Sequence, residues 1–345
     1  MALIEVENLA ITFKTQKGEI TPVRGITFNL EEGESLGVVG ESGSGKSLTN
    51  LAIMGLLPPN AIVTADKLLF NGQDLLNLSD FSWQKIRGEK MAMIFQDAMT
   101  ALNPCYNVEF QIQETLKIHT SLNRKERLER CIHLLDLVGI ADPNSRLKSF
   151  PHELSGGMAQ RVMIAIALAC NPKVLIADEP TTALDVTIQD QILKLIMEIQ
   201  EKNKMALILV THDIGVVSEF SKNIQVMYAG EIVEKGPTKE IIKYPRHPYT
   251  QGLLNSRPGH SVIFRERLPS ISGLVPDMRQ RPLGCQFRPR CTFASENCER
   301  PIELYPSQFA FEKNRSEHNS TMMSITTPSV RQIRCIHPLE GERNA

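Results

Sequence analysis

The chain has almost no excess of either charge. Its 345 residues contain 38 Lys+Arg against 39 Asp+Glu, which gives a formal net charge of −1. A protein that holds nucleic acid through phosphate contacts normally carries a basic excess. The charge balance therefore argues against nucleic acid as a partner.

Long apolar runs are also missing. The longest uncharged apolar run in the middle of the chain, Val162 to Cys170, is far shorter than the ~18 to 20 residues that span a bilayer. The first residues, MALIEVENLAITF, lack the basic and apolar segments of a secretory signal. With 42% hydrophobic and 22% charged residues and no internal repeat, the sequence is typical of a globular protein. We expect a cytosolic chain of about two domains that does not itself cross a membrane.

Cysteine is scarce and unevenly placed, with seven in the chain. Three lie in the first half and are expected to be small buried hydrophobes: Cys105, Cys131 and Cys170. Four lie in the last quarter: Cys285, Cys291, Cys298 and Cys335. In a reducing compartment such a cluster suggests metal binding before disulfides.

The apolar pattern predicts an α/β fold. Residues 3–35 alternate apolar and polar side chains between glycines and prolines, which predicts short antiparallel strands. The apolar run 36–39 meets a Gly-rich segment, and a helical pattern follows through Met54. The runs 174–177 and 206–210 are typical of buried parallel strands. Because ligands bind at the carboxyl ends of such strands, the polar residues after these three runs are expected to meet in one crevice.

The middle and the end of the chain have a different texture. Three stretches between residues 105 and 170 are helical in pattern: Glu109 to His119, Lys125 to Val138 and Gly157 to Cys170. Past residue 235 prolines become frequent. We predict a domain over 1–240 with a helical subdomain at about 97–165, a boundary near 236–250 and a second domain over 241–345.

One segment matches the pattern G-x-x-x-x-G-K-[ST]. It consists of Gly40, Glu41, Ser42, Gly43, Ser44, Gly45, Lys46 and Ser47. In this pattern backbone N–H groups surround a phosphate, the lysine reaches the β- and γ-phosphates, and the hydroxyl ligates Mg²⁺. A plain Gly/Ser turn is the alternative, but the strand before and the helix after favour a phosphate-binding loop. The predicted fold class is α/β, a P-loop NTPase core with an antiparallel β subdomain, a helical insertion and a small Cys-containing C-terminal domain.

Two further segments supply candidate site residues. Asp178 and Glu179 close the strand at 174–177, where the Asp can hold Mg²⁺ and the Glu can deprotonate an attacking water. The segment LSGGMAQ begins an amphipathic helix and offers a second anion site. Its candidate residues are Ser155, Gly156, Gly157 and Gln160. Taken alone, the acidic pair is more often a helix cap or a solvated turn, and the Ser is as often a plain N-cap.

The phosphate loop, LSGGMAQ and VLIADEP, in this order, resemble the ATP-binding subunit of an ABC transporter. The resemblance implies roles for four more residues. Gln96 matches the Q-loop residue that touches Mg²⁺ and the attacking water, and His212 matches the switch histidine on the γ-phosphate. Asp185 lies in the D-loop, and Phe13 fits the aromatic that stacks on adenine, where Tyr is commoner.

The resemblance also implies a dimer. In this family LSGGMAQ closes on the phosphate loop of the facing subunit, and this chain has one segment of each kind. It would therefore be half of a pair with two ATP sites. ATP would drive closure, and hydrolysis, with Glu179 as the base, would reopen the pair.

The C-terminal region narrows the resemblance. The segments HPYT at 247–250 and LGCQFRPRC at 283–291, followed by Cys298 and Cys335, resemble the tail of dipeptide and oligopeptide importer ATPases of the D type. The resemblance implies a [4Fe–4S] cluster on Cys285, Cys291, Cys298 and Cys335. From the residues alone, zinc and unligated core cysteines stay open. The spacings of five and six residues do not suit the tighter cysteine pairs of a zinc finger.

The implied partners are two transmembrane permease subunits, a second ATPase subunit that is usually a paralogue, and a periplasmic peptide-binding protein, with no nucleic acid. The chain would lie peripherally on the cytoplasmic face of the inner membrane. The cargo stays open: di- and tripeptides lead, and longer peptides, haem-like compounds and antimicrobial peptides are alternatives.

Two other classes of protein share the phosphate loop. An ABC ATPase that acts on nucleic acid or ribosomes carries two modules or a long coiled-coil insertion, and this chain shows one module and no sustained heptads. A small-molecule kinase would not need LSGGMAQ. The transporter subunit is therefore the preferred interpretation.

Overall fold

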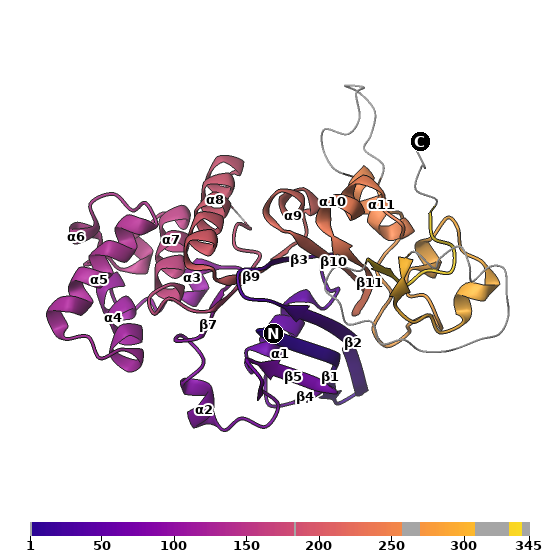
Figure 1. Cartoon of the computed structure of the whole chain (residues 1–345), viewed down its shortest axis with the longest axis horizontal. Coiled ribbons are helices and arrows are strands. Elements are labelled where there is room, and N and C mark those ends of the chain that lie inside the picture. Colours follow the sequence, from indigo (N-terminus) through magenta and orange to yellow (C-terminus); the bar gives the residue numbers. More distant parts are fainter. Residues whose placement is uncertain (1, 183, 257–269, 308–330, 340–345) are drawn as a thin grey trace. The chain divides into compact units, whose positions relative to one another are not determined.

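The computed structural model describes residues 2–182, 184–256, 270–307 and 331–339 (Figure 1). The chain forms two compact units, each assembled from segments far apart in the sequence. The first contains Met1–Leu3, Glu31–Ser35 and Asn77–Val210, and the second contains Ile4–Leu30, Leu36–Leu76 and Thr211–Ala345. Within the described ranges, every helix is too short or too polar to cross a membrane.

An antiparallel sheet forms one part of the second unit. Its strands are β1 (Ile4–Thr15), β2 (Gly18–Leu30), β4 (Ala61–Thr64), β5 (Lys67–Phe70) and β6 (Gln73–Asp74). Strand β1 pairs antiparallel with β2, β4 and β5. The predicted antiparallel pairing of residues 3–35 is confirmed, but the predicted shortness of the strands is wrong. Pro22 and Gly25 lie inside β2, and the β1–β2 register shifts at three places, so the irregular residues form bulges instead of ending strands.

A second sheet in this unit begins with β3 (Ser35–Val39). It pairs in parallel with β10 (Asn223–Tyr228), which pairs antiparallel with β11 (Glu231–Pro237). The short strands β13 (Gln332–Ile333) and β12 (Tyr305–Pro306) extend this edge. The helices of the unit are α1 (Lys46–Ile53), α9 (Ile214–Phe220), α10 (Thr238–Lys243) and α11 (Pro248–Asn255), with two 3₁₀ turns at Arg288–Arg290 and Glu296–Glu299.

A buried carboxylate holds the C-terminal strand to this sheet. Glu234 of β11 is fully buried and accepts hydrogen bonds from the backbone N–H groups of Arg246 and His247, both at 3.0 Å. The Arg331 guanidinium, also largely buried, forms an ion pair with the same carboxylate at 2.5 Å. A charge without water needs such a set of donors, so Arg331 and Glu234 stabilise each other in place.

The first unit contains three parallel, fully buried strands, β7 (Met91–Ile94), β8 (Val174–Asp178) and β9 (Ala206–Thr211). Its helices are α2 (Asp80–Gln84), α3 (Ala98–Ala101), α4 (Val108–His119), α5 (Arg124–Leu137), α6 (Pro143–Arg146), α7 (Gly156–Ala167) and α8 (Val186–Asn203), with a 3₁₀ turn at Pro151–Glu153. Figure 1 shows α4 to α7 gathered as one helical group. The predicted helices of this stretch are confirmed within a few residues.

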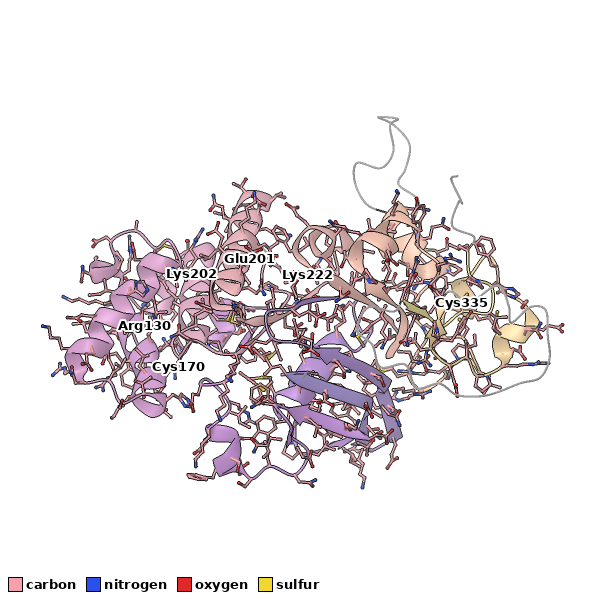
Figure 2. All side chains as sticks on the ribbon, in the orientation of Figure 1. Arg130, Cys170, Glu201, Lys202, Lys222 and Cys335 are labelled. Atoms are coloured by element: carbon pink, nitrogen blue, oxygen red, sulfur yellow. The ribbon has the colours of Figure 1, made fainter. Side chains whose placement is uncertain are left out.

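Side-chain caps explain where these helices begin. Asn107 caps α4 through Phe110 N–H at 2.9 Å, and Asn123 forms a capping box with Glu126 at α5. Arg130 of α5 then donates to the Asn171 side chain at 2.8 Å and to Ala169 O at 3.3 Å, just past α7. Figure 2 labels Arg130 and Cys170, the residue between these two acceptors. The helices are thus joined by polar contacts as well as by packing.

The three cysteines of the first half differ in environment. Cys131 is buried and Cys170 half-buried, and burial raises the pKa of the Cys131 thiol to about 12 and of the Cys170 thiol to about 11. Cys105 is exposed, so its predicted burial is wrong. It lies in the turn before α4, where its backbone N–H donates to the Asn103 side chain at 2.9 Å.

Candidate functional site

The phosphate loop connects β3 to α1 in the second unit, as the sequence predicts. A Cβ atom at Gly40 would lie 2.1 Å from the backbone O of Met227, so only glycine fits there. Gly45 precedes α1 with φ +96°, a left-handed backbone that glycine adopts without strain. Ser44 accepts a hydrogen bond from Gly230 N–H through its backbone O at 3.0 Å. The loop is therefore fixed by strand β10 and the turn after it.

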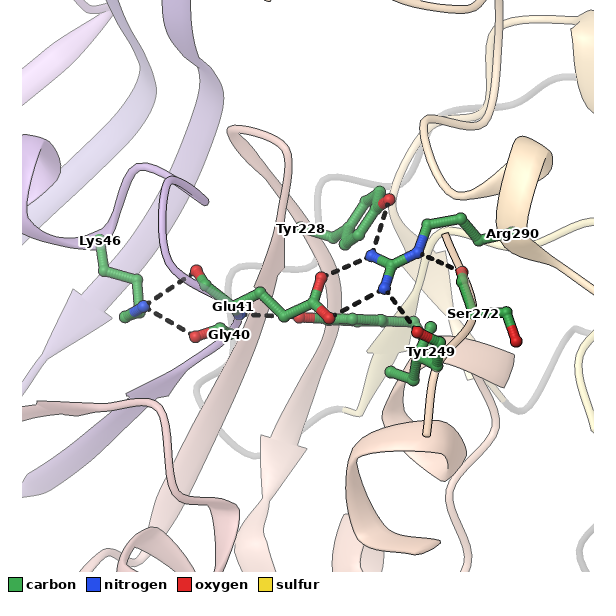
Figure 3. Close-up of polar contacts among 8 residues, drawn as sticks. Gly40, Glu41, Lys46, Tyr228, Tyr249, Ser272 and Arg290 are labelled. Carbon is green, nitrogen blue, oxygen red and sulfur yellow. Dashed lines mark hydrogen bonds and ion pairs between the residues drawn. The ribbon is translucent and has the colours of Figure 1, made fainter. Parts of the chain in front are cut away.

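Lys46 is buried although it carries a charge. Its side-chain Nζ donates to Gly40 O at 2.7 Å and to Glu41 O at 3.2 Å, so the ammonium group lies across the start of the loop (Figure 3). The first turn of α1 contains Ser47 and has no acidic residue. A helix N-terminus, a lysine and closely spaced backbone N–H groups together suit a polyphosphate anion.

Polar side chains that follow strands β7 and β8 of the first unit contact one another around Glu179. Asp178 is the last residue of β8 and is buried, and Glu179 follows it. Gln96, two residues past β7, donates from Nε2 to Glu179 Oε2 at 3.2 Å. Thr182 Oγ1 donates to the same oxygen at 2.9 Å. The structure thus brings together the two residues that the sequence offered as base and Q-loop residue.

The backbone at Glu179 is strained. Its φ of 48° is unusual for a residue with a side chain, and its N–H donates to Val210 O at 2.9 Å. Such strain persists where the surrounding structure enforces it, often at functional sites. The neighbouring strand β9 therefore fixes the direction in which the Glu179 carboxylate leaves β8.

The LSGGMAQ segment begins helix α7. Ser155 caps it, accepting Met158 N–H at 3.3 Å, so the plain N-cap alternative describes what this side chain does within the chain. Gly156 and Gly157 form the first turn, and Ser155 and Gly156 are exposed. The buried Gln160 donates from Nε2 to Pro180 O, which ties α7 to the residue after Glu179. Asp185 caps α8 in the same way, through Ile188 N–H at 3.0 Å.

The remaining candidates lie in the second unit. His212 directly follows β9 and is exposed, and Asp213 beside it caps α9 through Gly215 N–H at 2.7 Å. Phe13 is half-buried on β1, opposite Ile20 of β2 and Ala61 of β4. That these residues and the phosphate loop meet Glu179 in one crevice stays a prediction.

Comparison with known proteins decides the family. Residues 23–182 match the family described as "ABC transporter", and residues 233–298 match "Oligopeptide/dipeptide transporter, C-terminal region". The dipeptide transport ATP-binding protein DppD of Escherichia coli K12 is 52% identical over 298 residues, covering 86% of this chain and 91% of the relative. The chain belongs to the ABC transporter ATP-binding proteins.

Two further comparisons agree. The oligopeptide transport ATP-binding protein OppD of Bacillus subtilis is 51% identical over 293 residues, which is 85% of this chain and 82% of the relative. A solved dimeric ABC transporter cassette, MJ0796, matches with a TM-score of 0.61 at 28% identity, over 68% of this chain and 98% of the cassette. The predicted fold class, an ABC-type ATPase core, is confirmed, and ATP binding follows from the family.

The predicted metal centre of this ABC ATPase is wrong. The four C-terminal thiols do line one pocket, together with His247, so their proximity was correctly predicted: Cys285, Cys291, Cys298 and Cys335. However, in the described part of the chain no group of three or more His, Cys, Asp or Glu side chains is arranged to hold a metal ion. Burial raises the pKa of the Cys285 thiol to about 11 and of the Cys335 thiol to about 12. The [4Fe–4S] cluster and the zinc alternative are therefore not supported.

The predicted loop residue Glu41 has two partners, Arg290 and Tyr249, that are not among the predicted site residues. The Glu41 carboxylate forms a two-pronged ion pair with Arg290, and the Tyr249 hydroxyl accepts Glu41 N–H at 2.8 Å. Arg290 is 249 positions away in the chain. A carboxylate inside a phosphate loop is the one sequence signal that could have prompted a search for a compensating cation.

Proposed function

We propose that this chain is the ATP-hydrolysing subunit that energises import of di- and oligopeptides across the bacterial inner membrane through separate permease subunits. The observation that carries the proposal is the combination in one chain of an ABC transporter segment and an oligopeptide/dipeptide transporter C-terminal region. The names of DppD and OppD, dipeptide and oligopeptide transport ATP-binding proteins, support the cargo class. A position on the cytoplasmic face of that membrane, held by the permeases, belongs to the same proposal.

The residue roles follow from the chemistry of the groups. The phosphate loop, with Lys46, binds the triphosphate of ATP, and Phe13 stacks on adenine. Glu179 takes a proton from the attacking water, and His212 contacts the γ-phosphate. The hydrogen bond from Gln96 to Glu179 uses the amide nitrogen, and this leaves the amide oxygen for other contacts.

The donor set fits Mg²⁺. The Ser47 hydroxyl, the Asp178 carboxylate and the Gln96 amide oxygen are hard oxygen ligands of the kind that Mg²⁺ takes beside substrate phosphates. When bound, the ion neutralises charge on the β- and γ-phosphates.

A second ATPase chain, usually a paralogue, completes the proposed assembly. This chain has one phosphate loop and one LSGGMAQ segment, and Ser155 and Gly156 are exposed at the start of α7. The proposed partner supplies its phosphate loop to that segment. The matched cassette is described as dimeric, and a second structure of it is described as a post-hydrolysis state bound to ADP and Pi. ATP-driven closure followed by hydrolysis and reopening suits that arrangement.

Exposed apolar side chains in the segment that contains Gln96 suit the permeases. We call the set the α3–α4 surface; its members are Phe95, Met99, Tyr106 and Phe110, each between 40% and 44% exposed. Tyr106 stacks on Phe110 with ring centroids 4.2 Å apart. Grouped exposed aromatics mark a protein contact more often than a bare surface. A permease bound there would contact the chain next to the residue that touches Glu179.

We expect Phe110→Glu to weaken co-purification with the permease subunits at least tenfold, because a carboxylate is costly to bury against an apolar partner. The measurement is the ratio of permease to this chain after affinity purification. Leu128→Glu, at a 37% exposed position on α5, is the matched control and is expected to leave the ratio unchanged. Equal permease recovery with Phe110→Glu would place the contact elsewhere.

The proposed function is tested by purifying the intact complex and offering it a peptide panel. We expect two permeases, a second ATPase chain and a peptide-binding protein to assemble with this chain, and di- or tripeptides to be taken up in an ATP-dependent way. Assembly with ribosomes or nucleic acid, and no response to peptides, would overturn the proposal.

A further inference from the structure

The C-terminal region contacts the phosphate loop through the side chain of Arg290. This side chain also donates to the backbone O atoms of Ile271 and Ser272, and all three residues lie in the second unit with the loop. The Arg290 side chain is only 5% exposed and its Nη1 lies 2.5 Å from Glu41 Oε2. Figure 3 shows the guanidinium between Glu41 and Ser272.

Every N–H of the Arg290 guanidinium has a partner. Nη1 donates to Glu41 Oε2 and to the Tyr228 hydroxyl at 3.3 Å. Nη2 donates to Glu41 Oε1 at 3.0 Å and to Ile271 O at 3.1 Å, and Nε donates to Ser272 O at 2.9 Å. A guanidinium has five N–H donors in a rigid fork that matches a carboxylate, so the site is specific for arginine.

Three groups of one loop residue, Glu41, have partners: its side chain, its N–H and its backbone O. The Glu41 side chain is bound by Arg290, its N–H donates to the Tyr249 hydroxyl, and its O accepts from Lys46 Nζ. Phe287 packs against Tyr228 and Tyr249 with ring centroids 5.2 and 5.3 Å away, so the rings on this side are fixed as well. Glu41, the second residue of the phosphate loop, is therefore positioned by the C-terminal region.

The charge of Glu41 links its contact with Arg290 to nucleotide binding. It is the one acidic residue of the loop 40–47, and a carboxylate there repels the triphosphate. We propose that Arg290 is a positioning residue for nucleotide binding, which holds the phosphate loop through Glu41 and cancels the charge of that carboxylate toward MgATP. The inference rests on the proposed function, in which this loop binds ATP.

The test is MgATP affinity of the full-length chain, measured by titration calorimetry, with unfolding midpoints recorded in parallel. Arg290→Gln leaves the Glu41 charge uncompensated and is expected to weaken binding about tenfold, which corresponds to about 1.4 kcal/mol. Arg290→Lys keeps the charge with fewer donors and is expected to lose about threefold. The double variant Glu41→Gln/Arg290→Gln removes both charges and is expected to bind within about threefold of the parent chain.

A matched control separates positioning from loss of stability. Arg331→Met breaks the buried ion pair with Glu234 in the same C-terminal region, without touching the loop. It is expected to lower the unfolding midpoint and to leave MgATP affinity unchanged. If Arg331→Met weakens binding as much as Arg290→Gln, the effect is general destabilisation. If the double variant binds as weakly as Arg290→Gln, the Glu41 charge is not what weakens binding. Either result overturns the inference.

The outcome also distinguishes this inference from the proposed function. Lys46→Ala removes the loop's own cation and serves as the reference for lost binding. If Lys46→Ala loses MgATP while Arg290→Gln binds like the parent chain, the role of Arg290 is overturned and ATP binding by the loop stands. If Lys46→Ala binds as well as the parent chain, ATP binding by the loop fails, and the inference fails with it.

Discussion

Glu179→Gln is expected to lower the rate of ATP hydrolysis about 10²- to 10⁴-fold and to leave ATP binding intact. The amide has the size of the carboxylate and its oxygen can still accept from Gln96 or Thr182, but it cannot take a proton from water. The measurements are steady-state phosphate release by the assembled complex and nucleotide affinity of the full-length chain.

The control for this variant is Glu201→Gln, an exposed carboxylate near the end of α8. It changes the net charge equally and is expected to leave phosphate release unchanged. Hydrolysis near the parental rate in Glu179→Gln would refute the assignment of Glu179 as the base.

Lys46→Ala is expected to weaken MgATP binding at least about 100-fold. The lysine is a buried cation at the start of α1, and hydrogen bonds to charged groups contribute about 1.5–3 kcal/mol each. Loss of two phosphate contacts therefore corresponds to roughly 10²- to 10⁴-fold in affinity. Equilibrium binding of MgATP to the full-length chain is the measurement.

The matched substitution is Lys14→Ala, at an exposed lysine of β1 in the same unit. Affinity equal to the parent chain is expected there. Normal MgATP affinity in Lys46→Ala would remove the phosphate-loop assignment, whatever the fate of the other roles.

Much of the fold could be predicted because its signals are local. Buried parallel strands are continuous apolar runs, so β3, β8 and β9 lie where the sequence indicates. Helices α4 and α5 carry both an apolar period and Asn caps. The lengths of β1 and β2 are not predicted correctly, because a glycine or a proline can form a bulge inside a strand as well as a turn that ends it.

What the sequence could not supply is pairing over long separations. The contact between Glu41 and Arg290 depends on how the C-terminal region packs, and nothing in the spacing of either segment indicates it. Strands β12 and β13 are two residues each, too short for a periodic signal. The cysteine cluster shows a different error. The proximity of Cys285 and Cys335 is predicted correctly, but the metal inferred from it is wrong, because in the described residues the ligating side chains are not arranged to hold one.

The most direct test of the account is the response of ATP hydrolysis to peptide. The assembled complex, with its permeases in proteoliposomes and its peptide-binding protein added, is given a dipeptide, and phosphate release and peptide uptake are measured together. We predict that dipeptide raises phosphate release, that uptake accompanies it, and that Glu179→Gln in this chain abolishes uptake along with that increase in phosphate release. Hydrolysis that ignores peptide, or uptake that persists with Glu179→Gln, would contradict the claim that this chain drives peptide import by hydrolysing ATP.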